Sequence, residues 1–470
     1  MKKRVLLLNP PGSQKFLRDY FCSHSSKANY YWQPYDLFVL SGFLKDHFEL
    51  SAIDSIIDNL SIDQTYDKIK QIQPDIIIFL TGAVSWNEDF EFIENLLMLL
   101  TKKPYVVGIG DILRAEPEEF LRKYPFLQAV LLNFINGENL VKLLIESPNA
   151  EEIKDIVYKK DGEIIFGEID SSKNPFSLPT AVYELFSYEK YRIPHGRRIP
   201  FAGILTDYGC PFQCSYCIGG ELGYRVRDVE NSIAEMKYLK SIGIKELWFK
   251  NLTFAANRKH TVELLNRMLE EKFDFSWVCI SRANVLDEPL LELMKKAGCH
   301  TIQLGVETSD EELLEKYSKG ITPDQIKKVF DLCKKIGIRI LGHFILGLPG
   351  DTEEKILKTI EYAKSLNPEF ASFNVAMPRM GTKFREEAIE KGFISSEDNV
   401  LDNSISFPII ETETLSREKL WELRNKAIRE YHLRPSYIIS RILNIKTLYE
   451  LQTLFIEGIA MLKTTLKRNG

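Results

Sequence analysis

Short apolar runs alternate with helical patterns along most of the chain, and this rhythm restricts the fold more than any other feature. Several of the runs are apolar on both faces, as strands are when helices cover both sides of their sheet. In the first 148 residues the runs are Val5–Asn9, Leu50–Asp54, Asp75–Leu80, Tyr105–Gly110 and Ala129–Asn133, with helical stretches such as Trp86–Leu100 and Glu138–Ile145 between or after them. The pattern predicts an α/β protein that begins with a Rossmann-like (flavodoxin-like) parallel sheet.

The same rhythm returns from about residue 201. Six further runs occur there, at Ala202–Tyr208, Glu246–Lys250, Phe275–Ser281, Thr301–Val306, Ile338–Leu346 and Phe370–Ala376. Six βα units are too few for a complete eight-unit barrel, so they predict a partial (β/α)6 barrel.

The remaining segments complete the predicted domain organisation. Val157–Lys160 and Glu163–Phe166, joined through Asp161-Gly162, predict a hairpin. We therefore place a Rossmann-like domain at 1–148, a hairpin and linker at 149–199, a barrel at 200–395 and a helical region at 396–470.

Three cysteines follow the first barrel strand, at Cys210, Cys214 and Cys217, with Tyr216 just before the third. Three thiolates on one short loop can ligate three irons of a four-iron cluster and leave the fourth iron open to a small molecule. A structural zinc site is the alternative, but zinc needs a fourth ligand nearby, and no cysteine or histidine lies between Cys217 and His260. The other four cysteines, at positions 22, 279, 299 and 333, are expected to be structural.

Polar residues or glycines also follow most of the other predicted strands. Barrel enzymes carry their chemistry at the carboxyl ends of the strands, where this chain has Asn251, Ser281, Arg282, Glu307 and Gly347. A salt bridge between Arg282 and Glu307, or simple turns at Asn251 and Gly347, are the plainer interpretations. In the N-terminal domain the corresponding positions are Asn9, Pro10, Ser85, Gly108, Gly110, Gly137 and Glu138. Turn chemistry explains any one of these glycines, whereas together they predict a ligand site.

With these motifs in view, residues 1–395 resemble a radical S-adenosylmethionine (SAM) enzyme with an N-terminal cobalamin-binding domain. The resemblance implies that the three cysteines hold a [4Fe-4S] cluster. It also implies that Tyr216 lies along the adenine of SAM, that Arg282 meets its carboxylate and that Glu307 meets its ribose or amino group, with Asn251, Ser281 and Gly347 nearby. Lys250-Asn251 departs from the Gly-Gly-Glu or acidic signature often found in the family at that strand end.

The resemblance further implies a cobalamin site formed by Asn9, Pro10, Ser85, Gly108, Gly110, Gly137 and Glu138. None of the seven histidines lies in a D-x-H-x-x-G motif, so any cobalamin is expected to lack a histidine lower ligand. The long aromatic segment Arg18–Asp36 follows the first strand. It is interpreted either as a segment that caps cobalamin or shapes the substrate site, or as a lid that packs for stability.

The activity expected from the resemblance is methylation of an unactivated carbon, with cobalamin as methyl carrier and a 5′-deoxyadenosyl radical derived from SAM. Two alternatives stay open: radical coupling, cyclisation or rearrangement without methyl transfer, and a non-catalytic iron–sulfur redox protein. The expected partners are a small-molecule or lipid substrate and a reductase, flavodoxin or ferredoxin as electron donor.

Composition narrows the setting in which the chain works. The formal net charge of −5 gives no support for a nucleic-acid partner. The N-terminus does not read as a secretory signal, and no run of apolar residues is long enough to span a membrane, so we expect a cytoplasmic protein. A C-terminal helical stripe, Leu448, Leu451, Phe455, Ile459, Leu462 and Leu466, is expected to dock on the barrel or, alternatively, to contact a membrane surface.

Overall fold

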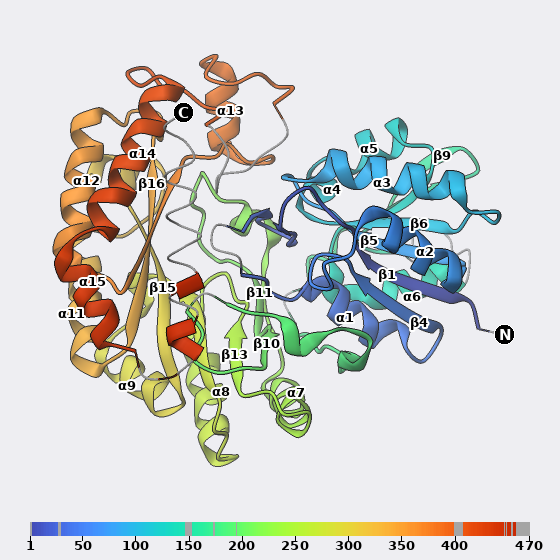
Figure 1. Ribbon diagram of the computed structural model, residues 1–470, viewed down its shortest axis with the longest axis horizontal. Coiled ribbons are helices and arrows are strands. Elements are labelled where there is room, and N and C mark those ends of the chain that lie inside the picture. Colours follow the sequence, from blue (N-terminus) through green and yellow to red (C-terminus); the bar gives the residue numbers. More distant parts are fainter. Residues whose placement is uncertain are drawn as a thin grey trace. The chain divides into compact units, whose positions relative to one another are not determined.

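The computed structural model describes residues 2–26, 30–145, 153–172, 174–193, 195–398 and 408–456, with gaps at 446, 448, 453 and 454. The chain divides into two compact units, Met1–Ser26 with Tyr31–Tyr191 and Lys27–Tyr30 with Arg192–Gly470. Each unit is described by itself below (Figure 1).

The described residues of the first unit contain a seven-stranded sheet in the order β4-β1-β5-β6-β7-β8-β9. Its first five strands in this order are parallel, which confirms the predicted fold class. The order reverses at β1, and this reversal is the point at which doubly wound sheets bind ligands. The strands are β1 (Arg4–Asn9), β4 (Glu49–Asp54), β5 (Ile76–Leu80), β6 (Tyr105–Ile109), β7 (Leu127–Leu131), β8 (Ile156–Lys160) and β9 (Glu163–Phe166).

Helices cover both faces of this sheet, so that β5 is buried along its whole length. Aromatic contacts join neighbouring helices, such as Tyr66 of α2 with Phe92 of α3, whose ring centroids are 4.8 Å apart. The helices are α1 (Tyr35–Leu44), α2 (Ile62–Ile72), α3 (Trp86–Leu99), α4 (Asp111–Ala115), α5 (Pro117–Lys123) and α6 (Gly137–Ile145). Between β1 and α1, the strands β2 (Phe16–Leu17) and β3 (His24–Ser25) form a small antiparallel ribbon.

The predicted hairpin is present as β8 and β9. The φ values of Asp161 and Gly162 are +50° and +85°. Both are positive, as a type I′ turn requires of its two central residues. β8 also pairs antiparallel with β7, so the hairpin extends the first sheet. Sequence analysis assigned it to a separate segment, because a hairpin's own sequence does not encode which sheet edge it joins.

The second unit contains, within its described part, a six-stranded parallel sheet in the order β10-β13-β14-β15-β16-β17, which agrees with the predicted partial barrel. The aromatic rings of Phe249, Phe254 and Trp277 pack against one another in its core. The strands are β10 (Phe201–Ile204), β13 (Glu246–Phe249), β14 (Ser276–Ser281), β15 (Cys299–Glu307), β16 (Arg339–Leu346) and β17 (Phe370–Val375). The helices are α7 (Val229–Ser241), α8 (Arg258–Glu270), α9 (Glu288–Lys296), α10 (Glu311–Lys316), α11 (Pro323–Ile336), α12 (Glu353–Leu366), α13 (Lys383–Glu390), α14 (Arg417–His432) and α15 (Pro435–Leu443).

One predicted strand divides in two. The run Ala202–Tyr208 forms β10, and then the chain turns into β11 (Asp207–Gly209), which pairs antiparallel with β12 (Tyr224–Val226). The division matters because the three-cysteine loop lies between β11 and β12.

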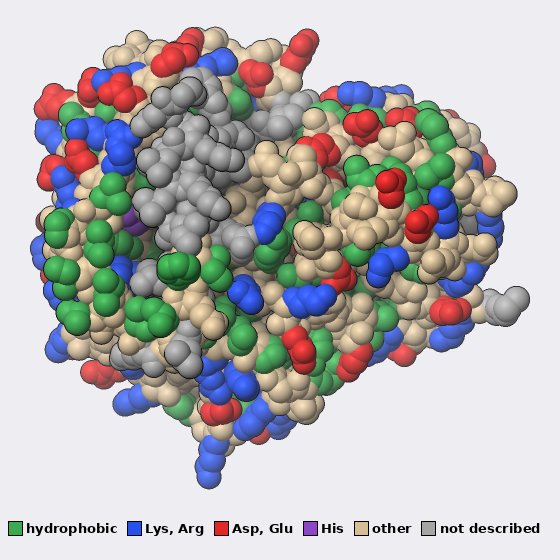
Figure 2. Space-filling model, in the orientation of Figure 1, with side chains coloured by type: hydrophobic (Ala, Val, Ile, Leu, Met, Phe, Trp, Pro, Cys, Tyr) green, Lys and Arg blue, Asp and Glu red, His purple; other side chains and the backbone are tan. Residues whose placement is uncertain are grey.

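The C-terminal region contains the predicted helices, and α14 packs on β17, where Tyr431 and Phe373 are in ring contact at 5.9 Å. Of the predicted C-terminal stripe, Leu448, Ile459, Leu462 and Leu466 lie outside the described residues. Among the residues that are described, no helix is both long and apolar enough to cross a membrane. Acidic and basic side chains are interspersed over the face shown in Figure 2.

Candidate active site

The three-cysteine loop is held at both ends by the β11–β12 ribbon. Gly209 pairs with Tyr224, and the Cys210 backbone N–H donates to the Gly223 carbonyl at 3.0 Å. Gly209 has a φ of +75°, and a Cβ at this position would lie 1.7 Å from the Gly223 oxygen. Only glycine therefore allows the ribbon to close before the first cysteine.

Each of the three sulfurs has a hydrogen-bonding neighbour. Arg282 Nη1 donates to Cys214 Sγ at 3.0 Å, the Thr253 hydroxyl lies 3.4 Å from Cys210 Sγ, and the Gly219 backbone N–H donates to Cys217 Sγ at 3.3 Å. Burial raises the pKa of the Cys210 thiol, so deprotonation there depends on iron binding. Such hydrogen bonds are compatible with thiolate ligands of a cluster, whose reduction potential depends in part on hydrogen bonds to its sulfurs.

Arg282 lies at the carboxyl end of β14 and is buried. Its guanidinium packs 4.0 Å from the centroid of the Phe212 ring, and a second N–H donates to the Lys319 carbonyl. Arg282 therefore connects the cysteine loop with the loop that follows α10. Its predicted contact with a SAM carboxylate stays a prediction.

Glu307 ends β15 with a φ of +64°, a backbone conformation that side chains rarely adopt. Its carboxylate pairs with the Lys319 ammonium at 2.5 Å, and both side chains are more than nine-tenths buried. A Cβ on Gly305 would lie 2.3 Å from Glu307 Oε1 and 2.7 Å from Lys319 Nζ, so glycine makes room for the pair. Sequence analysis missed Lys319. The turn Ser318-Lys319-Gly320, between α10 and α11, was its only signal.

The Tyr216 side chain is buried near Glu307 and Cys214. Burial raises its pKa, and the negative charges of Glu307 and Cys214 raise it further. Its buried hydroxyl has no hydrogen-bond partner in the described part of the chain. An unpaired hydroxyl beside a carboxylate and a thiol is a group that a polar ligand could satisfy.

Asp207 begins β11, directly before the loop, and Asn251 follows β13. The Asn251 amide donates to the Thr206 hydroxyl at 2.9 Å. Asp207 accepts a hydrogen bond from the Tyr224 hydroxyl at 3.4 Å, and burial raises its pKa to about 7. Asp207 is not among the predicted site residues, because the sequence pattern predicts one continuous strand over Ala202–Tyr208.

Two further predicted residues make contacts within the chain. The Ser281 hydroxyl donates to the Phe254 carbonyl at 2.7 Å. Gly347, with a φ of +83°, donates its N–H to Asp351 at 2.9 Å, and a Cβ there would lie 2.5 Å from Leu420 of α14. Binding of SAM by Asn251, Ser281 and Gly347 stays a prediction.

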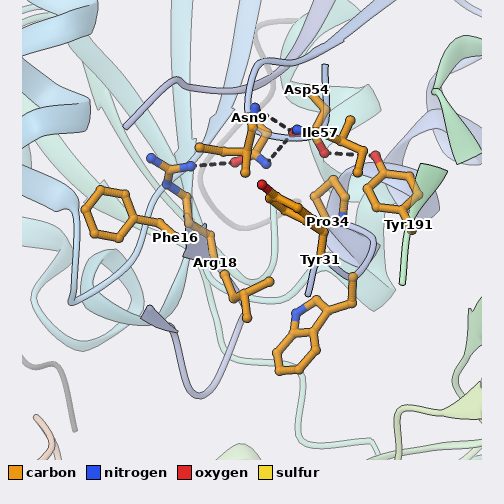
Figure 3. A pocket seen from close by; sticks show the side chains of 11 residues that line it. Asn9, Phe16, Arg18, Tyr31, Pro34, Asp54, Ile57 and Tyr191 are labelled. Carbon is orange, nitrogen blue, oxygen red and sulfur yellow. Dashed lines mark hydrogen bonds between the residues drawn. The ribbon is translucent and has the colours of Figure 1, made fainter. Parts of the chain in front are cut away.

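In the first unit, Asn9, Pro10 and Ser85 each accept a hydrogen bond from the side chain of Arg18, near the carboxyl ends of β1 and β5. Figure 3 shows the contact between Arg18 and Asn9. Gly108, Gly110 and Gly137 each have a neighbour within the fold that a Cβ would overlap: Leu113, the Thr81 carbonyl and Phe43. Glu138 is exposed in the first turn of α6. Contact between these seven residues and cobalamin stays a prediction. The role of Arg18 was missed.

The remaining cysteines are Cys22, Cys279, Cys299 and Cys333, and none of these four forms a disulfide. The last three are buried, as expected of small apolar side chains. In the described part of the chain, no three His, Cys, Asp or Glu side chains converge as ligands of a single metal ion would. A cubane makes no such demand, because each cysteine ligates a different iron.

Comparison with known proteins agrees with this geometry. Residues 204–363 match the profile of the radical SAM superfamily. The chain is 30% identical over 424 residues to an uncharacterized methyltransferase (PH0819) of Pyrococcus horikoshii, covering 87% of this chain and 90% of that protein. It is 23% identical over 428 residues to an anaerobic magnesium-protoporphyrin IX monomethyl ester cyclase of Rubrivivax gelatinosus, covering 87% and 75%.

Among solved structures, the fold is similar to that of the radical SAM methyltransferase TsrM from Kitasatospora setae with cobalamin and a [4Fe-4S] cluster bound. The TM-score is 0.71 at 17% identity, and the match covers 98% of this chain and 99% of that one.

Proposed function

Because this chain belongs to the radical SAM enzymes of the cobalamin-binding type, we propose that it is a methyltransferase that acts on an unactivated carbon. The observation that carries the proposal is the loop of three thiols that lies beside Arg282, Glu307 and the unpaired hydroxyl of Tyr216. The name of the Pyrococcus relative supports methyl transfer in particular.

When bound, a [4Fe-4S] cluster and SAM supply the 5′-deoxyadenosyl radical, and the protein supplies binding and orientation. Cys210, Cys214 and Cys217 would each ligate one iron. Arg282 donates to Cys214 and so offsets the negative charge of that thiolate.

The buried groups next to the loop suit SAM, whose methionine part carries both an ammonium and a carboxylate. Glu307 and Lys319 supply one charge of each sign, and they would exchange their contact with each other for contacts with these two groups of SAM. The Tyr216 hydroxyl offers a hydrogen bond that no described residue takes. These side chains would hold SAM by its polar groups and exclude water around it.

Cobalamin belongs to the proposal as the methyl carrier, on the strength of the family. The residues expected to bind it do not fit it in this structure, because the polar groups of Asn9, Pro10 and Ser85 are engaged by Arg18. A small-molecule or lipid substrate, an electron donor of the flavodoxin, ferredoxin or reductase type, a cytoplasmic location and contact of the C-terminal helix with a membrane surface are likewise proposals.

The test uses protein reconstituted with iron and sulfide without oxygen. We expect about four irons per chain, a reduced-cluster signal in electron paramagnetic resonance that shifts when SAM is added, and formation of 5′-deoxyadenosine. Replacing Cys214 by alanine should abolish the signal and the cleavage of SAM. The matched control, Cys22→Ser, removes a cysteine outside the loop and should keep both. A cluster that does not respond to SAM would contradict the radical activity.

Methyl transfer has a separate readout. With SAM labelled in its methyl group and added hydroxocobalamin, we expect the label to appear in methylcobalamin. If the protein cleaves SAM but never transfers the label, the methyltransferase assignment is wrong and the assignment of radical activity stands.

Radical chemistry without methyl transfer is the second candidate, favoured by the relative that is named as a cyclase. It predicts deuterium transfer from a labelled substrate into 5′-deoxyadenosine and a product that gains no methyl group.

A further inference from the structure

At the switch point of the first unit, the side chain of Arg18 lies beside Asn9 and lines the small crevice that is left there (Figure 3). Its guanidinium donates to Asn9 Oδ1 at 2.8 Å, to the Pro10 carbonyl at 3.0 Å, and to Ser85 Oγ and Asp89 Oδ2 at 3.0 Å each. The third guanidinium nitrogen, Nη2, donates to the other carboxylate oxygen of Asp89. The side chains of Arg18 and Asp89 have no exposed surface. Asn9, Pro10 and Ser85, which the resemblance assigns to cobalamin, therefore accept hydrogen bonds from Arg18 instead.

The surrounding space is equally occupied. Asp54, at the end of β4, accepts hydrogen bonds from Asn9 Nδ2 and from the Tyr191 hydroxyl, each at 2.8 Å. Between these groups, Arg18 and Tyr31, a cavity of about 10 Å³ is left. That volume is close to the least that holds one water molecule. On the other side of β5, the position of a Cβ on Gly110 lies 2.0 Å from the Thr81 carbonyl oxygen.

Opening this crevice would separate a buried and fully hydrogen-bonded ion pair. Such a separation is strongly unfavourable, because it leaves a carboxylate without its counter-charge in a site that water does not reach. The Thr81 and Ser85 hydroxyls also donate to Asp89, each at 2.7 Å, so the carboxylate is held from several sides. A ligand group would have to replace all of these contacts to gain entry.

We propose that Arg18 keeps the switch-point crevice closed to the nucleotide tail of a corrinoid, so that a corrinoid bound by this chain is held through its ring while its tail stays outside the sheet. The inference rests on the proposed role of cobalamin. It explains why Asn9, Pro10 and Ser85 are hydrogen-bonded to Arg18.

The test compares cobalamin with cobinamide, which has the same ring but no nucleotide tail. The dissociation constants of hydroxocobalamin and aquocobinamide, measured by absorption with the full-length protein, should agree within about threefold. A preference for cobalamin of more than about tenfold would overturn the proposal. So would faster hydrogen exchange of residues 16–25 on addition of cobalamin, because tail entry must displace that segment.

A double variant shows whether Arg18 is the cause. Arg18→Ser with Asp89→Ser removes both charges together and opens space, so it should prefer cobalamin over cobinamide by about tenfold. The matched control, Arg4→Ser with Asp75→Ser, removes a partly exposed ion pair of the same unit and should show no preference. A folded double variant without a preference would overturn the role of Arg18. If that variant does not fold, hydrogen exchange of the unaltered protein decides.

If neither corrinoid binds the unaltered protein, this inference and the role of cobalamin both fail. Cleavage of SAM, measured on the same protein, would still report separately on the radical activity.

Discussion

At the scale of single residues, the cysteine loop is flanked by two buried polar atoms without a hydrogen-bond partner among the described residues, Asp207 Oδ1 and the Tyr216 hydroxyl. A buried carboxyl with one oxygen unpartnered and no counter-charge favours its neutral form, because ionisation would place a charge in a poorly solvated site. This explains why the pKa of Asp207 rises to about 7.

A pH dependence of stability follows for the protein without iron. Between about pH 4 and pH 7 the folded chain keeps the proton on Asp207 and the unfolded chain loses it, so stability falls as the pH rises through this range. The full loss is on the order of 4 kcal/mol and is complete above pH 7. Asp207→Asn avoids it. In thermal unfolding the variant should therefore melt several degrees above the unaltered protein at pH 8, and at nearly the same temperature at pH 4.

The control for this measurement is Asp67→Asn, an equal change of charge on an exposed helical residue, which should show no such trend. A difference in melting temperature between Asp207→Asn and the unaltered protein that stays constant from pH 4 to pH 8 would argue against a neutral Asp207.

At the scale of elements, the β11–β12 ribbon decides where the cysteines lie. Gly209→Ala should prevent the ribbon from closing, because the added Cβ overlaps the Gly223 carbonyl, and should reduce iron incorporation to less than about a tenth. Gly243→Ala is a matched control: Gly243 has a φ of +86° but nothing within 4 Å of its Cβ position. It should lower stability by about 1 kcal/mol and leave the iron content unchanged. Equal iron content in both variants would show that the ribbon is not needed.

The sequence predicted most elements well, because a buried parallel strand and its helix leave a strong local pattern. It did not predict β11 and β12, whose three residues each are too few for a pattern to emerge. The site was predicted in part. The spacing of Cys210, Cys214 and Cys217 identifies them in the sequence. The roles of Lys319 and Arg18 depend on ion-pair partners that come close only after folding.

At the scale of the whole molecule, the first unit has a complete sheet and should fold alone. A fragment of residues 1–191 should unfold cooperatively. A fragment of residues 1–148, which ends where sequence analysis placed the domain boundary, lacks β8, β9 and the hydrogen bond from Tyr191 to Asp54. It exposes the edge of β7 and should aggregate or melt at least ten degrees lower. Equal melting temperatures of the two fragments would support the earlier boundary.

Arg282 donates both to Cys214 and to the Lys319 carbonyl, and this couples two parts of the site. Its guanidinium joins a sulfur of the cysteine loop to the carbonyl of Lys319, and the Lys319 side chain in turn pairs with Glu307. Oxidation of the Cys214 sulfur would remove one of the two contacts that hold Arg282. The turn that carries Lys319 should then become less ordered, so damage at the sulfur should also weaken binding of the cosubstrate.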